Sequence, residues 1–132
     1  MNVKIDTKEK FHVITLPGPQ ITATMTAELS DSLLPYLQND VKNVILNMKE
    51  VSEIEILAAE TLVKVQQRFY EKNASFLICE MQAPVEKSLE TAGLLEMMNC
   101  TPTESEAWDI VQMEEIEREL MDSEDINLDI ED

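Results

Sequence analysis

The stretch from Val44 to Val63, VILNMKEVSEIEILAAETLV, constrains the fold of this chain more than any other. It begins with a short apolar run that ends at Asn47, passes through a turn, and continues into a helix whose start contains Ala58 and Ala59. A short, continuously apolar run is typical of a strand that is buried on both faces of a sheet. The stretch therefore predicts a strand, a turn and a helix that packs on the sheet.

The residues on either side of this unit also alternate between strand and helix patterns. Strands are predicted over residues 2–6, 10–16, 42–48, 75–80 and 97–100, the last as a weak edge strand. Helices are predicted over residues 24–39, 57–72 and 84–93, and from Thr103 onward, where Thr103 and Glu106 form a capping box. Pro35 interrupts the first helix, which is expected either to kink there or to stop near Leu34 and restart. The pattern predicts an α/β fold.

The chain is strongly acidic, with 27 acidic and 10 basic residues and a net charge of −17 over 132 residues. Such a field repels phosphate backbones and anionic lipid headgroups, so binding to nucleic acid or a membrane surface is not expected. A basic protein partner is one explanation of the charge, and solubility alone is the other.

Two further features of the sequence bear on location and redox state. No apolar run approaches the roughly 18–20 residues of a membrane span, and the first residues, MNVKIDTKEKFHVITL, lack the layout of a signal peptide, so a cytoplasmic protein is expected. Cys79 and Cys100 have no metal-binding spacing and lie in apolar segments. They are interpreted as buried free thiols rather than as a disulfide or a reactive site.

The residues needed for catalysis are not arranged in a recognisable pattern. His12 is the only histidine and lies inside a predicted strand, where it is expected to face solvent or a neighbouring strand. Glu53 and Glu55 are paired in the key turn, but two carboxylates without further ligands are a weak cation signal. No metalloprotease, nucleophile-elbow or phosphate-loop motif is present, so no enzyme activity, metal or cofactor is expected.

Acidic residues dominate the C-terminal part of the chain, and Arg118 is the only basic residue after residue 113. We therefore divide the chain into a domain over residues 1–113 and an acidic extension over 114–132 that is helical at first. The helical pattern fades after about Met121. The composition favours a solvated, partly disordered end, whereas the interleaved apolar residues over 126–132 are also compatible with a short strand or a segment that folds on a partner.

Several motifs occur in an order that resembles the STAS domain, the module of bacterial anti-sigma factor antagonists and of sulfate-transporter tails. The resemblance covers roughly residues 2–113. It rests on the strand VILN, the pair Val51-Ser52, Glu55 in the place of the family's aspartate, LETAGLLEMM at 89–98, and TPTESEAWDIV at 101–111. It implies a mixed sheet of about five strands with about four helices, mainly on one face.

The sequence departs from the family at the phosphorylation site. The family's phosphoacceptor position falls on Ile56, its neighbouring serine on Leu57, and its glycine on Ala58. Ser52 is a hydroxyl in the same loop, but it lies four residues upstream and out of register. The resemblance therefore implies a domain that is not phosphorylated at the family position.

The expected function is that of a non-catalytic protein-interaction module. By analogy with the family, the partner would be an anti-sigma-type kinase or another regulatory protein. The candidate surface consists of Ser52, Glu53, Ile54, Glu55, Ile56, Leu57, Ala58, Glu60, Lys64 and Gln67. Within it, Ile54 is expected to pack under the helix, and Ile56 is equally compatible with a buried or an exposed position.

Two alternatives remain open at the level of the sequence. One is an accessory structural subunit of a transporter or another assembly, because some similar domains lack the phosphorylation switch. The other is a small-ligand or nucleotide-binding domain, which the two isolated glycines and the lack of basic residues near the loop disfavour.

Overall fold

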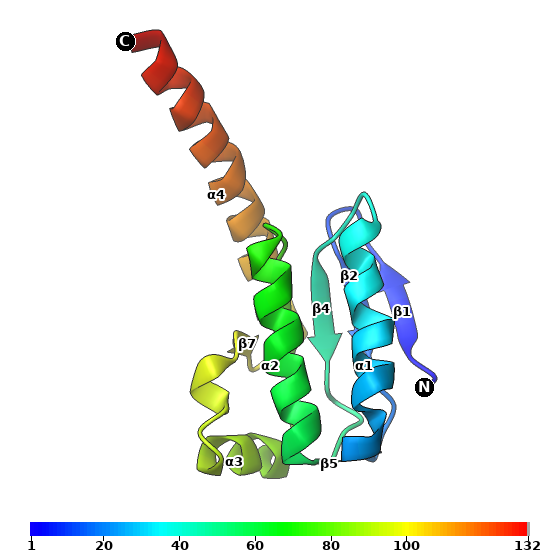
Figure 1. Ribbon diagram of the computed structural model, residues 1–132. Coiled ribbons are helices and arrows are strands. Elements are labelled where there is room, and N and C mark those ends of the chain that lie inside the picture. The colour runs from blue at the N-terminus through cyan, green and yellow to red at the C-terminus, as the bar shows by residue number, and fades with distance from the viewer. Residues whose placement is uncertain (132) are drawn as a thin grey trace.

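The computed structural model describes the backbone of residues 1–131 and the side chains of residues 1–121. Its centre is a five-stranded sheet in the order β1-β2-β4-β6-β7 (Figure 1). The strands are β1 (Lys4–Thr7), β2 (His12–Thr15), β4 (Val44–Asn47), β6 (Phe76–Cys79) and β7 (Cys100–Thr101). β1 pairs antiparallel with β2, whereas all the other neighbours are parallel, so the sheet is mixed as expected.

Two short strands form a separate small sheet beside the end of β4. β3 (Gln20–Ile21) pairs parallel with β5 (Glu53–Ile54). β3 follows β2 in the chain and β5 follows β4, so this sheet joins the two connections that leave the carboxyl ends of two adjacent parallel strands.

The helices cover both faces of the main sheet unequally. Within residues 1–131 the chain forms α1 (Thr26–Leu33), α2 (Ile56–Glu71), α3 (Ala83–Thr91) and α4 (Glu104–Glu131), together with the short 3₁₀ helices η1 (Ala23–Met25), η2 (Leu34–Gln38) and η3 (Leu95–Met97). The core under α1, α2 and α3 contains Ile14, Leu46 and Ile78 from the sheet. Since side chains alternate along a strand, the residues beside these face the opposite way, and Ile45 and Leu77 pack there against α4. The predicted fold class, with most helices on one face, is confirmed.

The interruption at Pro35 takes one of the two forms expected from the sequence. α1 ends at Leu33, and η2 restarts at Leu34 with Pro35 in its first turn. A proline has no backbone N–H to donate, and this loss is tolerated in the first turn of a helix, where the N–H groups have no partner within the helix. The helix therefore stops and restarts rather than kinking.

The last strand lies later in the chain than the sequence pattern indicated. Residues 95–97 form η3 instead of extended structure, and β7 comprises Cys100 and Thr101. The Met98 amide donates to the Leu95 carbonyl at 3.1 Å, which keeps this segment in a turn until Asn99. The prediction of an edge strand over residues 97–100 was therefore too early in the chain.

α4 is the longest element and extends past the sheet (Figure 1). Its start is capped twice: Thr103 Oγ1 accepts from the Glu106 amide at 3.2 Å, and a carboxylate oxygen of Glu80 accepts from the Glu104 amide at 2.7 Å. The helix continues without a break through residue 113, so the division of the chain at that position stays a prediction. The strand interpretation of the C-terminal residues is wrong over 126–131, where the backbone is helical.

A network of polar side chains fastens α4 beside the amino ends of β4 and β6. The Ser75 hydroxyl donates to Glu114 at 2.6 Å and accepts from Arg118 at 2.7 Å. Arg118 also contacts Glu115 at 3.0 Å, and Glu115 accepts from the Asn43 side-chain amide at 2.7 Å. Residues 114–118 are therefore in direct contact with the folded domain.

Tyr70 extends this network from α2. Its hydroxyl donates to Glu114 at 2.9 Å and accepts from the Asn99 side-chain amide at 2.6 Å. Burial of the phenol, followed by the nearby negative charge of Glu114, raises the pKa of Tyr70 to about 12. The network thus links α2, the sheet and α4.

Candidate protein-interaction site

The loop between β4 and α2 is held in place through its backbone. The Pro19 carbonyl accepts from the amides of Ser52 at 2.8 Å and Glu53 at 3.1 Å, and from the Ser52 hydroxyl at 3.2 Å. Gly18 packs against the Glu50 backbone so closely that a β-carbon at residue 18 would overlap the Glu50 carbonyl. The closeness of the two chain segments, rather than an unusual backbone angle, is the reason for a glycine here.

Glu53 and Glu55 of the loop are both engaged by donors from the segment around β3. The Glu55 amide donates to the Ile21 carbonyl at 2.9 Å, and its carboxylate accepts from the Ala23 amide at 2.8 Å. Glu53 accepts from the Gln20 side-chain amide at 2.8 Å. Glu55 thus joins the start of α2 to the turn before α1. Over the described part of the chain, no three histidine, cysteine or acidic side chains come close enough together to hold a metal ion.

The first turn of α2 presents two large apolar side chains to solvent. Ile56 is 41% exposed and Leu57 is 56% exposed, whereas Ile54 is 7% exposed and Ala58 is fully buried. Ile54 lies in β5 and points into the main core, and Ala58 begins the buried stripe of α2. Two of the residues named for the candidate surface, Ile54 and Ala58, therefore support the surface from below and have no area to offer a partner.

Ile56 borders an open groove between the start of α2 and α3. The groove has a volume of about 550 Å³ and is lined on the α3 side by Pro84, Lys87, Ser88, Thr91 and Ala92. Sequence reasoning missed these α3 residues. The pattern placed them on a helix, but it carried no signal that this helix lies beside the key turn.

The remaining candidates continue from Ile56 along the solvent side of α2. Glu60, Lys64 and Gln67 are all exposed. They follow Ile56 at intervals of four, four and three residues, which places them in one line along a helix. Ser52 is partly exposed, with its hydroxyl bonded to the Pro19 carbonyl. Ile56, Glu60, Lys64 and Gln67 thus form one strip along α2 with Leu57 beside its start, whereas Ser52, Glu53 and Glu55 lie in the loop before the helix.

The histidine and the two cysteines lie outside this loop. His12 is buried, with Nδ1 3.0 Å from the Thr7 hydroxyl on the neighbouring strand and Nε2 2.9 Å from the Val41 carbonyl. Cys79 is fully buried, and burial together with the negative charges of Glu104 and Glu80 raises its pKa to about 12, so the thiol stays protonated. Cys100 is also a free thiol, but it is only partly buried, contrary to the expectation for both cysteines.

The family model of the STAS domain matches residues 2–107, and the chain therefore belongs to the STAS domain family. This confirms the resemblance found in the sequence. A search of curated protein sequences gives no match.

Solved structures of STAS proteins share the fold. One is a putative anti-sigma factor antagonist from Thermotoga maritima, with 14% identity, a TM-score of 0.73, and coverage of 83% of this chain and 94% of that chain. Another is the anti-sigma factor antagonist SpoIIAA in its unphosphorylated form, with 18% identity, a TM-score of 0.65, and coverage of 84% of this chain and 96% of that chain.

A third similar structure is a transporter. The murine anion transporter Slc26a9 aligns with 15% identity and a TM-score of 0.67 over 79% of this chain, which is 18% of the transporter chain. Among the residues that the structure describes here, no helix combines the length and the hydrophobicity needed to cross a bilayer.

Proposed function

We propose that this STAS domain is a non-catalytic protein-interaction module of bacterial partner-switching regulation, acting in the cytoplasm through the exposed strip at the start of α2. The observation that carries the proposal is the solvent exposure of Ile56 and Leu57 beside the groove to α3. Large apolar side chains that protrude from a fixed backbone are typical anchors of a protein interface, since they bind without a large loss of conformational entropy.

The strip has a composition suited to such an interface. Glu53, Glu60 and Lys64 surround the apolar pair with charge, and Gln67 extends the strip along α2. Apolar centres with polar rims are the usual anatomy of interfaces between separately stable proteins. A standard interface needs roughly 800 Å² from each partner, so the partner would cover both the strip and the groove to α3.

The family's phosphoacceptor position is Ile56, which has no hydroxyl to receive a phosphate. We therefore propose that binding at this strip is not controlled by phosphorylation at that position. An isoleucine adds apolar contact area at the position where a phosphate would introduce a charge of about −2. The strip would then remain competent to bind its partner at all times, and control would come from the partner.

The experiment is affinity purification of the full chain from its native host, comparing the wild type with Ile56→Asp. The partner bound by the wild type should be lost or strongly reduced in the variant, because a charge in a desolvated apolar contact is costly. Ile5→Asp is the matched control, since Ile5 is 52% exposed on β1, outside the strip. Equal recovery by Ile56→Asp and the wild type, with both folded by circular dichroism, would contradict the proposed surface.

An accessory role on a transporter is the second candidate, because the similar domain of Slc26a9 is part of an anion transporter. The same purification separates the two, since an integral membrane transporter as the Ile56-dependent partner would favour the accessory role. A nucleotide or other small ligand as the natural target would instead be detected as a rise in melting temperature when the chain is screened with nucleotides.

A further inference from the structure

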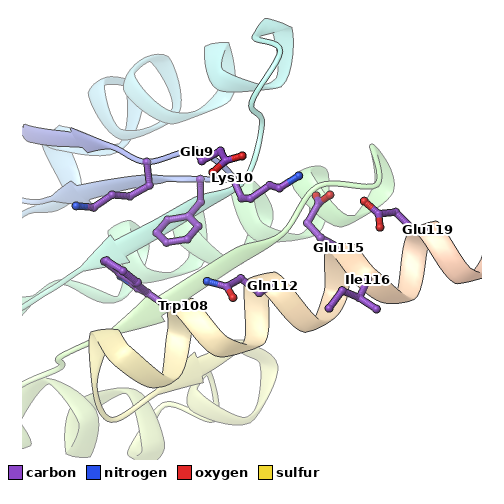
Figure 2. A pocket seen from close by; sticks show the side chains of 9 residues that line it. Glu9, Lys10, Trp108, Gln112, Glu115, Ile116 and Glu119 are labelled. Carbon is purple, nitrogen blue, oxygen red and sulfur yellow. The ribbon is translucent and has the colours of Figure 1, made fainter.

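A second groove lies at the opposite end of the sheet, between the β1–β2 hairpin and α4 (Figure 2). It has a volume of about 440 Å³, and its apolar surface comes from Phe11, Trp108 and Ile116. Phe11 and Trp108 are in edge-to-face contact, with ring centroids 5.2 Å apart, and Lys8 Nζ lies 5.2 Å from the Trp108 ring centroid. The groove therefore has a wall made of two aromatic rings in contact.

The groove continues onto exposed apolar side chains along α4. Met113, Ile116 and Leu120 are 53%, 55% and 56% exposed, and they stand at positions i, i+3 and i+7 of the helix. This spacing forms one seam on a helix, of the kind that pairs with another helix. The opposite side of α4 is the one that packs on the sheet, through Ala107 and Val111.

The charged residues around the seam indicate which kind of partner could bind there. Glu117 and Glu119 lie between Ile116 and Leu120 in the sequence, which places one of them on each side of the seam around the helix, and Glu119 also lines the groove. The only basic residue of α4 is Arg118, which is turned toward the sheet by its bond to Ser75. The solvent side of the seam is therefore bordered by acids, which attract lysine and arginine, whereas Lys8 and Lys10 line the groove at the hairpin, where the apolar end of an occupant would lie.

We propose that this groove and seam bind an amphipathic helix of a protein partner, with apolar residues at i, i+3 or i+4, and i+7, and lysine or arginine at the flanking positions. From Trp108 to Leu120 the surface is about 18 Å long, which corresponds to roughly 12 residues of the bound helix. One apolar end of that helix would contact Trp108 and Phe11 in the groove. A second copy of this chain is disfavoured as occupant, because it would bring the same acidic borders and a net charge of −17 against its own kind.

The test uses the full chain and three synthetic peptides of 14 residues without tryptophan. The first carries leucine in the helical pattern with lysine on its flanks, the second is a scrambled isomer of the first, and the third has glutamate in place of lysine. Trp108 is the only tryptophan of the chain and lies in the groove, so its emission reports occupancy of that site. The patterned lysine peptide should shift this emission and bind at least about ten-fold more tightly than the scrambled isomer.

Matched variants locate the binding surface. Replacing both Ile116→Ser and Leu120→Ser should weaken binding of the patterned lysine peptide by about ten-fold or more, because two exposed apolar contacts are lost without a change of charge. Ile5→Ser should leave the affinity unchanged, as should Leu57→Ser, which lies in the strip at the start of α2. The affinity should also fall with added salt.

Three results would overturn the proposal. The protein could bind the scrambled isomer, or the glutamate peptide, as tightly as it binds the patterned lysine peptide. Alternatively, the folded double variant could bind the patterned lysine peptide as tightly as the wild type does. The oligomeric state of the chain, measured by sedimentation at several salt concentrations, tests whether a second copy occupies the seam. A dimer that strengthens with salt and is lost in the double variant would assign the seam to a second copy of the chain instead. Since the Leu57 control separates the two surfaces, either proposal can fail without the other.

Discussion

The two ends of this domain are held together by different parts of the chain. At the loop before α2, main-chain atoms do most of the fastening: the carbonyls of Pro19 and Ile21 accept from the loop amides, and β3 pairs with β5. At the other end, side chains fasten α4, with Ser75 as the hub between Glu114 and Arg118. A backbone-held loop keeps its shape when exposed side chains change, whereas a side-chain-held helix depends on particular residues.

This difference bears on the proposed departure of the loop from the family's phosphorylation pattern. The amides and carbonyls that fix it do not depend on whether residue 56 is an isoleucine or a hydroxyl residue. Ile56 can therefore stand in the first turn of α2 with its side chain in solvent while the strand–turn–helix geometry is kept. The chemistry of the surface can change there without cost to the fold.

The largest effect is expected from breaking the backbone contact at the loop. In Gly18→Ala, the new methyl group would overlap the Glu50 carbonyl, and one of the two backbone segments would have to move. We expect a loss of about 3 kcal/mol in the free energy of unfolding, measured by urea denaturation.

Gly93→Ala is the control for Gly18→Ala. Gly93 has a φ of +75° but no atom within 4 Å of a β-carbon, so only backbone strain of about 1 kcal/mol is expected. If the two variants lose equal stability, close packing of Gly18 against Glu50 is not what holds the loop.

A smaller loss is expected from removing the hub at the α4 end. Ser75→Ala deletes the hydroxyl that donates to Glu114 and accepts from Arg118, and the site is fully buried. We expect the free energy of unfolding to fall by about 1.5 kcal/mol, with faster hydrogen exchange concentrated in α4. Ser88→Ala, at an exposed position of α3, should leave both quantities unchanged. Exchange that accelerates equally in the β4–α2 loop would show that the two ends are not held independently.

The smallest effect concerns the ionisation of Tyr70, which changes the stability of the fold only at alkaline pH. The pKa of Tyr70 is raised to about 12 in the folded protein, whereas the unfolded chain has the ordinary value of 10.0. The folded state therefore favours the protonated phenol, so its contribution to stability is complete below pH 10 and is lost as the pH rises toward 12.

Phenolate absorbance measures this directly in Tyr36→Phe, which leaves Tyr70 as the only tyrosine. The folded variant should titrate about two pH units above the same variant in urea. A midpoint near pH 10 in the folded protein would mean that Tyr70 is not buried against Glu114 as described.

The sequence predicted the strands best where every residue of the strand is buried. The apolar runs that became β4 and β6 are buried at every position, so no choice between two faces had to be made. The family motifs and the helix that follows them come from the same stretch; the helix was predicted to begin at Leu57 and begins at Ile56. The interruption at Pro35 was predictable because a proline removes a donor whatever its surroundings.

The features that could not be predicted depend on contacts between distant segments. The burial of Ile54 agrees with the expectation from the sequence, whereas the sequence left the position of Ile56 open; Ile56 is exposed and lies beyond the pairing of β5 with β3, which joins segments more than thirty residues apart. Glu114 and Glu115 occur in a run of acids that composition alone assigns to solvent. Their bonds to Ser75 and Asn43 become visible only when the sheet is assembled.

Because α4 is one continuous helix, the orientation of its exposed seam depends on how its buried side packs on the sheet. Ala107 and Val111 fix the rotation of the helix on the sheet, and a continuous helix transmits that rotation to Ile116 and Leu120. One residue inserted between Val111 and Met113 would turn the seam by about 100° about the helix axis, and it would also turn Glu114 and Arg118 away from Ser75. The direction in which the seam faces is thus set by the number of residues that separate it from Ala107 and Val111, the two residues that pack α4 on the sheet.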